Sequence, residues 1–254
     1  SFFIIITREF MSGHSKWATI KRKKAAIDAK RGKIFTKLIK ELMIAARDGG
    51  GDPEANPRLR QAISTAKAAN MPNDNINRAI LKGTGDLEGV TYEESTYEGY
   101  GPGGVAIFLE VLTDNKKRTV ADIRHLMNKH GGNLGENGSV AWMFEKQGQI
   151  SLSADGLDEN TVFEEALEVG ADDFSNNDGE FIITTVPSET VNVSDALSAK
   201  GYEITSSAVE MVPKNTVKVE GNDVGRLMTL MEGLEENEDI QNLYSNFDLD
   251  EADL

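Results

Sequence analysis

Hydrophobic and polar positions follow a helical spacing between residues 30 and 47. Apolar side chains recur there at i, i+3, i+4 and i+7, which predicts an amphipathic helix with one buried face. They are Phe35, Leu38, Ile39, Leu42, Met43 and Ala46. At roughly 100° per residue, Lys30, Lys33, Lys37 and Lys40 fall within about 80° of each other on the opposite side. We therefore expect one buried face and one face that carries a row of ammonium groups.

Two further helices are predicted from the signals at their ends. Gly49–Gly51 should end the first helix, and Asn56-Pro57 supplies the cap and first turn of a second one. A third, short helix over about 73–82 is expected to end at Gly83. Three helices with complementary apolar faces predict a small all-helical domain over residues 11–88.

After this domain the pattern changes to strands that alternate with helices. The run 105–112 is almost wholly apolar and rich in strand-forming residues, and it follows the glycine-rich corner Gly99–Gly104. We expect Thr119 and Asp122 to open a helix as a capping box, and Gln147-Gly148 to form a turn between two strands. The repeated β-α-β order predicts an α+β protein, with two small ferredoxin-like (split βαβ) α/β domains after the helical one.

Charge divides the chain more sharply than its net value of −15 suggests. Residues 11–82 carry 16 Lys and Arg against 6 Asp and Glu, an excess of +10, whereas residues 83–254 carry 10 against 35, or −25. Screening confines each charge to roughly 8–10 Å at physiological salt, so the local excess outweighs the whole-chain pI of about 4.7. The basic end therefore predicts a polyanionic partner.

The residues predicted to meet phosphates lie mainly in this basic end, because Lys and Arg side chains suit contact with nucleic-acid backbones. They are Lys16, Lys21, Arg22, Lys23, Lys24, Lys30, Arg31, Lys33, Lys37 and Lys40, with Trp17 as a stacking residue. Lys116, Arg118 and Arg124 extend the track from a second, smaller patch. The alternatives are an ordinary solvated face for the helical lysines and a core anchor for Trp17.

The sequence contains little that suggests catalysis or a cofactor. The spacing of Gly99, Gly101 and Gly104 matches the dinucleotide fingerprint, but that fingerprint needs a helix after it and a strand follows here. A hairpin corner is the better interpretation. His125 and His130 diverge on their predicted helix, and the acidic clusters lack calcium-loop spacing. The chain has no cysteine, which excludes thiolate catalysis and cysteine zinc sites. We expect a non-enzymatic protein with no cofactor and no metal.

The first ten residues and the compartment are interpreted from composition. The apolar run Phe2–Ile6 is too short for a membrane span or a signal sequence. We interpret residues 1–10 as an upstream extension before Met11. Without cysteine or a recognisable targeting or spanning segment, a cytoplasmic protein with no membrane partner is expected.

Five stretches of the chain are distinctive enough to compare with known families. They are GHSKWATIKRKKAAIDAKRGKIFTKLIKEL (13–42), GGGDPEANPRLRQAI (49–63), MPNDNINRAI (71–80), YEGYGPGGVAI (97–107) and NKKRTVADIRHLMNKHGGNLGENGSVAWMF (115–144). These stretches resemble the YebC family. The resemblance extends from Met11 to about Phe247. It implies that the helical domain precedes an α/β domain, residues 89–140 plus 208–254, into which a third domain, residues 141–207, is inserted.

The resemblance also implies a function. Members of this family, which includes the mitochondrial translational activator of cytochrome c oxidase, are regarded as non-enzymatic regulators of gene expression. Their partner is DNA at promoters, or ribosomal and transfer RNA during translation. A basic helix suits the phosphates of either. We expect a DNA-binding transcriptional regulator, with a ribosome-associated translation factor that relieves stalled translation as the alternative. A third interpretation has the acidic domains dock a basic partner such as a ribosomal protein.

Overall fold

The structure is a computed structural model that describes residues 31–177 and 179–249. Within them the chain forms two compact units, of which one contains residues 143–216 and the other contains residues 31–142 with 217–249. No helix in these described ranges is long and apolar enough to span a membrane.

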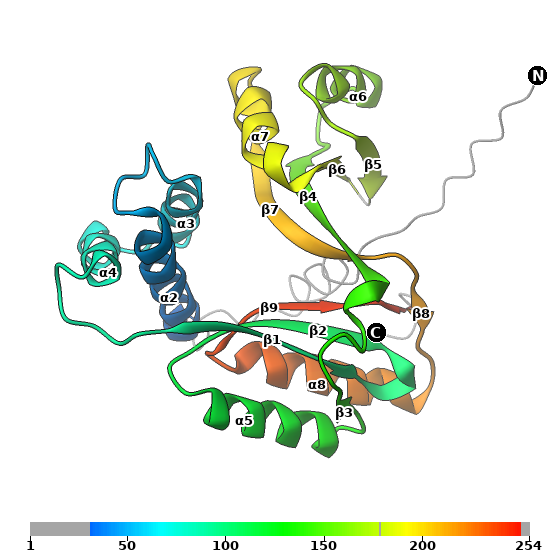
Figure 1. The fold of residues 1–254 in the computed structure, drawn as a ribbon. Helices are drawn as coiled ribbons and strands as arrows, with labels where there is room; N and C mark the ends of the chain where they lie inside the picture. Colours follow the sequence, from blue (N-terminus) through cyan, green and yellow to red (C-terminus); the bar gives the residue numbers. More distant parts are fainter. Residues whose placement is uncertain (1–30, 178, 250–254) are drawn as a thin grey trace, which may run out of the picture. The chain divides into compact units, whose positions relative to one another are not determined.

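Helices α2 (Arg31–Gly49), α3 (Pro57–Ala68) and α4 (Asn73–Thr84) form the N-terminal helical region (Figure 1). Their apolar faces meet in one core, made of Leu42, Met43, Ala45, Ala46, Leu59, Ala62, Ala66, Met71, Ile76 and Ala79. Asn56 caps α3 as predicted, because its side chain accepts a hydrogen bond from the Leu59 amide at 3.1 Å. The three predicted helices are confirmed.

Helix α4 continues past the glycine that was predicted to end it. Gly83 lies inside α4, and the left-handed residue at the helix end is Gly85, with a φ of +86°. A Cβ at Gly83 would overlap the carbonyl oxygen of Met43. This glycine therefore serves the close approach of α4 to α2.

The same unit contains a four-stranded antiparallel sheet in the order β3-β1-β2-β9, with two helices on one of its faces (Figure 1). Its elements are β1 (Glu93–Tyr100), β2 (Ala106–Thr113), α5 (Lys116–Lys129), β3 (Asn133–Leu134), α8 (Asn222–Glu236) and β9 (Ile240–Ser245). β2, α5 and β3 form a split βαβ unit, because β1 lies between the two strands. The short strands β8 (Val217–Lys218) and β10 (Phe247–Asp248) pair in parallel.

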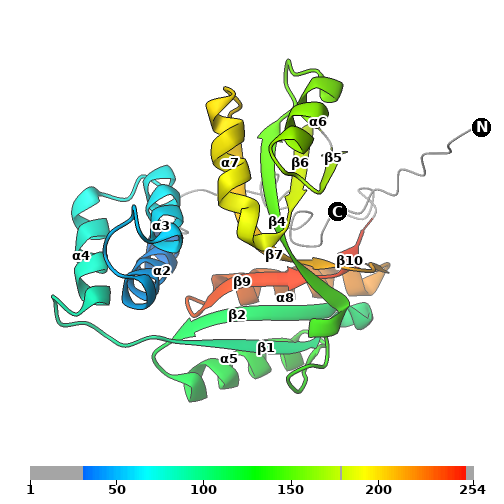
Figure 2. The same ribbon diagram turned by 45° about the horizontal axis from the view of Figure 1, so that its top comes forward.

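The other unit holds a second antiparallel sheet in the order β5-β6-β4-β7 (Figure 2). Its elements follow the ferredoxin-like βαββαβ order: β4 (Phe144–Ser153), α6 (Glu159–Glu168), β5 (Asp173–Asn177), β6 (Glu180–Thr185), α7 (Thr190–Ala199) and β7 (Ile204–Pro213). Side chains of both helices meet alternate residues of β4 and β6 in a separate core. Because β7 pairs with β4 as far as Pro213, this unit ends after Thr216, later than the expected boundary at residue 207.

Two local predictions about the two sheet-containing parts of the chain are wrong. Gly148, predicted to form a turn with Gln147, lies inside β4 opposite Thr185. A Cβ there would overlap the hydroxyl groups of Thr185 and Thr190, so this glycine marks close packing. Helix α5 begins at Lys116 and is capped by Asn115, before the capping box expected at Thr119. Thr119 is instead fully buried.

Candidate nucleic-acid interface

The C-terminal half of helix α2 is buried on its apolar side and also on the side that carries the lysines. Its apolar side enters the helical core through Leu42 and Met43. Its lysine side is closed as well, because Lys40 is only 5% exposed. The prediction that Lys40 lies on an open face is therefore wrong. Helical spacing locates a lysine on one face of a helix, but it does not show what that face contacts.

The Lys40 ammonium group is fully engaged by the protein itself. Its Nζ donates to Asp239 Oδ1 at 2.7 Å, to the Glu238 carbonyl oxygen at 3.0 Å and to the Leu112 carbonyl oxygen at 3.3 Å. The ammonium also lies over the Tyr92 ring, 5.1 Å from its centroid. Because a lysine has three donors, Lys40 has none left for a phosphate.

Asp239, between α8 and β9, is the common acceptor of this cluster. Its Oδ2 accepts from Thr119 Oγ1 at 2.7 Å and from an Arg118 guanidinium nitrogen at 2.8 Å. Burial alone would raise the pKa of Asp239, but the hydrogen bonds from Arg118, Lys40 and Thr119 outweigh it and lower the pKa to about 2. The carboxylate therefore stays ionised while buried. We call Asp239 with Lys40, Arg118 and Thr119 the Asp239 anchor.

Lys37 and Lys33 face the C-terminal end of α8. Lys37 Nζ donates to the Glu235 carbonyl oxygen at 2.7 Å, and Lys33 forms an ion pair with Glu236 at 3.6 Å. The last carbonyl groups of a helix lack intrahelical partners and carry partial negative charge, so they accept cations well. The Lys33 pair is open to solvent, with its side chains 43% and 57% exposed. We call Lys33, Lys37 and Lys40 the lysine row of α2. Its side chains become less enclosed from Lys40 towards Lys33.

The second predicted patch is also partly neutralised by acidic neighbours. Lys116 pairs with Glu93 at 2.6 Å, and Arg118 joins Asp114 and the Asp239 anchor, each at 2.8 Å. Arg124 is exposed and takes no part in the ion pairs found within residues 31–177 and 179–249. Of the three predicted residues in this patch, Arg124 is the one that forms no ion pair with the described residues.

Most of the remaining predicted contacts lie outside the described residues. They are Lys16, Trp17, Lys21, Arg22, Lys23, Lys24 and Lys30. Arg31 opens α2, but its side chain lies outside the described part as well. Residues 11–30 hold six Lys and Arg against one acid, and residues 31–82 hold ten against five. Half of the +10 excess therefore belongs to each stretch.

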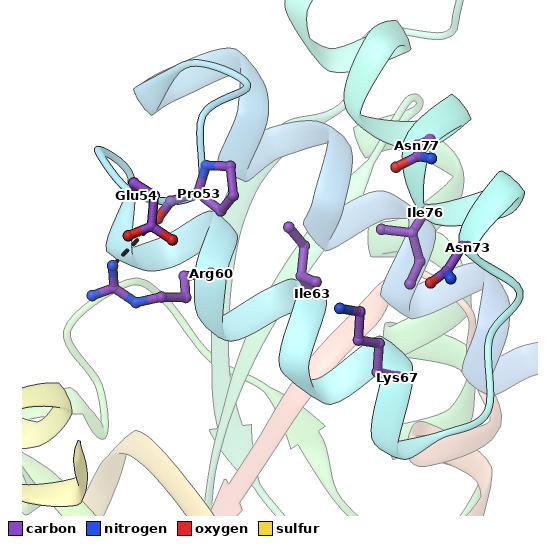
Figure 3. A pocket seen from close by; sticks show the side chains of 8 residues that line it. All are labelled: Pro53, Glu54, Arg60, Ile63, Lys67, Asn73, Ile76 and Asn77. Atoms are coloured by element: carbon purple, nitrogen blue, oxygen red, sulfur yellow. Dashed lines mark hydrogen bonds between the residues drawn. The ribbon is translucent and has the colours of Figure 1, made fainter.

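A hollow of about 460 Å³ lies between α3 and α4 (Figure 3). It is lined by Pro53, Glu54, Arg60, Ile63, Lys67, Asn73, Ile76 and Asn77. We call it the α3–α4 groove. The guanidinium of Arg60 donates to the Pro53 carbonyl oxygen at 3.3 Å at one end of it. This groove was not predicted from the sequence, although the i, i+3, i+7 spacing of residues 60, 63 and 67 places them on one face of a helix.

The glycine-rich corner is a hairpin, as interpreted from the sequence. Gly103 and Gly104 have φ values of +73° and +76°, and β2 begins at Ala106, where a dinucleotide fold would need a helix. Gly99 allows a second close approach, because a Cβ there would overlap the Asn133 carbonyl oxygen. Among the described residues no group of three His, Asp or Glu side chains could hold a metal ion.

Comparison with known proteins covers almost the whole chain. Residues 15–86 match the TACO1/YebC protein N-terminal domain, and residues 92–247 match the TACO1/YebC second and third domain. A protein of Syntrophus aciditrophicus (strain SB) named probable transcriptional regulatory protein is 57% identical over 94% of this chain and 96% of its own length. A relative from Desulfotalea psychrophila, also named a probable transcriptional regulatory protein, is 56% identical over 95% of this chain and 97% of its own length.

A solved structure shares the fold. The crystal structure of a conserved hypothetical protein from Aquifex aeolicus matches with a TM-score of 0.84 and 46% identity, and the match covers 93% of this chain and 98% of that one. The two domain matches and the nearly full-length relatives, with which this solved structure agrees, show that the chain belongs to the TACO1/YebC family.

Proposed function

We propose that the chain is a non-enzymatic, nucleic-acid-binding regulator of gene expression, acting in the cytoplasm as a DNA-binding transcriptional regulator. The name shared by its relatives supports the regulatory part. The binding part is carried by one observation, the segregation of charge into +10 over residues 11–82 and −25 over residues 83–254. A surface of one sign attracts a partner of the other and speeds its association.

The phosphate contacts are assigned to a smaller set of residues than the sequence alone suggested. The set is Lys16, Lys21, Arg22, Lys23, Lys24, Lys30, Arg31, Lys33 and Arg124, with Trp17 stacking beside them. Lys40 is left out because its three donors are already bound within the protein, and Arg118 is left out because one of its nitrogens bridges the carboxylates of Asp114 and Asp239. Lys37 and Lys116 are left out because each lies 2.7 Å or less from its own acceptor.

A pair of matched charge reversals tests this assignment. Lys23→Glu with Lys24→Glu should reduce the slope of log affinity against log salt by about 1.8 for duplex DNA, since each lost phosphate contact removes about 0.9. Lys146→Glu with Lys214→Glu makes the same change in net charge at exposed lysines of the other unit, and should leave affinity within about two-fold. Gel shifts at several salt concentrations provide the measurement. Equal losses for the two double variants would contradict the assignment.

The identity of the partner is tested by crosslinking in cells. Recovery of promoter DNA supports a transcriptional regulator, whereas recovery of ribosomal or transfer RNA supports the translation-factor alternative, since phosphates of both kinds suit a basic surface. Deletion of residues 11–82 should abolish both. A partner retained by that deletion variant would instead support docking of a basic protein, such as a ribosomal protein, on the acidic domains.

A further inference from the structure

We propose that the α3–α4 groove binds a single nucleotide of an unpaired strand, with its phosphate at Lys67 and its base edge at Asn73 and Asn77. This inference rests on the proposed function, because it names the part of the nucleic acid that the helical region holds. The groove is separate from the Asp239 anchor, and none of its lining residues belongs to the lysine row of α2.

The two walls of the groove offer complementary chemistry. Lys67 on α3 is exposed and supplies a mobile ammonium group for a phosphate. Asn73 and Asn77 on α4 are four residues apart, so both side chains lie on one face of that helix. Each carboxamide presents a donor and an acceptor, the combination with which Asn pairs to the edge of adenine.

The floor between these walls is apolar. Ile63 is partly exposed and Ile76 is 3% exposed; in Figure 3, Ile63 lies between Arg60 and Lys67 along α3, and Ile76 lies beside the two asparagines on α4. Aliphatic side chains there give the flat face of a base a surface to cover. A volume of about 460 Å³ lies within the roughly 300–1,000 Å³ typical of small-ligand sites. The groove is therefore large enough for one nucleotide.

The charges that line the groove indicate at which end a phosphate would bind. Glu54 lies beside Arg60 and Pro53 at the opposite end from Asn73 and Asn77 (Figure 3). A phosphate next to Glu54 would be repelled, whereas one at Lys67 would not. We therefore place the phosphate at Lys67 and leave Arg60, already bonded to the Pro53 carbonyl, out of the subsite.

An unpaired strand fits this arrangement better than a duplex. Asn can also pair with the adenine edge that duplex DNA exposes in its major groove, but a hollow can enclose the whole base only when the base is out of the stack, as in an unpaired strand. A single carboxamide-lined hollow with one cation matches one extruded nucleotide. It does not match the long run of phosphates on a helix.

The absence of cysteine from the chain allows a site-specific crosslinking test. Glu54→Cys, which lines the groove but has no assigned contact to the nucleotide, is labelled in the full chain with a benzophenone maleimide and irradiated with an unpaired oligoadenylate. The matched control is Thr65→Cys, an exposed, uncharged position on α3 that is about 160° around the helix from Lys67. We expect at least about five-fold more crosslinking from position 54. Equal crosslinking from the two positions would overturn the proposal.

A second pair of variants measures the phosphate contact. Lys67→Gln and Lys82→Gln each remove one exposed cation from the helical region, but Lys82 does not line the groove. Lys67→Gln should lower the salt slope for oligoadenylate by about 0.7, with several-fold weaker binding by fluorescence anisotropy, and Lys82→Gln should change affinity less than two-fold. A Lys67→Gln effect of equal size on duplex and unpaired strands would reveal a plain backbone contact and overturn the nucleotide subsite.

The two proposals fail in different ways. If Lys23→Glu with Lys24→Glu weakens binding while Lys67→Gln and Asn77→Ala bind as the wild type does, the groove proposal is wrong and the proposed function stands. If the unmodified chain binds neither duplex nor unpaired strands, the proposed function is wrong, and the groove proposal is overturned with it.

Discussion

Lys40 on α2 and Lys67 on α3 belong to the same small helical region, yet their surroundings leave them very different chemistry. Lys40 is 5% exposed, with its three donors bound to Asp239 and to two carbonyl oxygens. Lys67 is exposed at the edge of a groove. The attraction between a cation and an anion strengthens as water is excluded. The neighbouring element therefore decides whether a lysine holds the fold together or is available to a partner.

The same contrast holds within α2. Lys33 and Lys40 are two turns apart on one side of the helix, and both meet acidic residues near the end of α8. The Lys40 pair is almost fully enclosed, with side chains 6% and 8% exposed, whereas the Lys33 pair is open to solvent. Buried pairs are costly to break and exposed pairs are not. The comparison therefore predicts a graded series of effects.

The largest effect is expected at Asp239. Asp239→Ala removes the carboxylate that Lys40, Arg118 and Thr119 share and leaves a buried ammonium without its counterion. Loss of one member of a buried pair costs about 3–5 kcal/mol, so the free energy of unfolding should fall by that amount. Urea unfolding followed by circular dichroism at 222 nm measures it.

A matched acidic residue serves as the control. Asp114 pairs with the same Arg118 at 2.8 Å, but its side chain is 40% exposed, so Asp114→Ala should cost less than about 1 kcal/mol. Adding Lys40→Met to Asp239→Ala should restore part of the lost stability, because an apolar side chain can occupy a buried site without a counterion. If Asp114→Ala and Asp239→Ala lowered the free energy of unfolding equally, the claim that enclosed ion pairs stabilise the fold more than exposed ones would be contradicted.

The next largest effect is a dependence on pH. The pKa of Asp239 is lowered from 3.8 to about 2 in the folded protein, so the unfolded state binds the proton more readily. The resulting stabilisation is fully present above about pH 4 and is lost as the pH falls through about 2. It amounts to about 2 kcal/mol. The stability difference between the wild type and Asp239→Asn should therefore narrow between pH 5 and pH 2. A constant difference would show that the carboxylate charge is not what holds Lys40.

Local signals predicted the fold well. The i, i+3, i+4 spacing of α2, the Asn56 cap and the apolar run that became β2 all act over a few residues, which is the range that a sequence pattern reports. Gly83 and Gly148 were misread as helix end and turn, because their real roles depend on distant partners, Met43 in one case and Thr190 in the other. A glycine alone does not distinguish a turn from a close contact.

The site could be predicted only in part, for the same reason. Lys40 and Asp239 are 199 residues apart in sequence, and no local pattern connects them. The charge division locates an excess of Lys and Arg in residues 11–82, but it does not distinguish an enclosed lysine from an exposed one. The α3–α4 groove joins residues of two helices, and its lining appears only once α3 and α4 pack together.

The smallest effect on stability is expected at Lys33, which forms an ion pair within the protein and is also exposed enough to contact a phosphate. Its pair with Glu236 is 3.6 Å long and exposed on both sides, so Lys33→Gln should change the free energy of unfolding by less than about 0.5 kcal/mol. A phosphate can displace such a weak partner at little cost, so the same variant should lower the salt slope for duplex DNA by about 0.9. Urea unfolding and gel shifts on the same preparation measure both. A clear loss of stability would make Lys33 part of the anchor, and unchanged values in both measurements would remove it from the proposed interface, leaving residues 16–31 and Arg124 as the phosphate contacts.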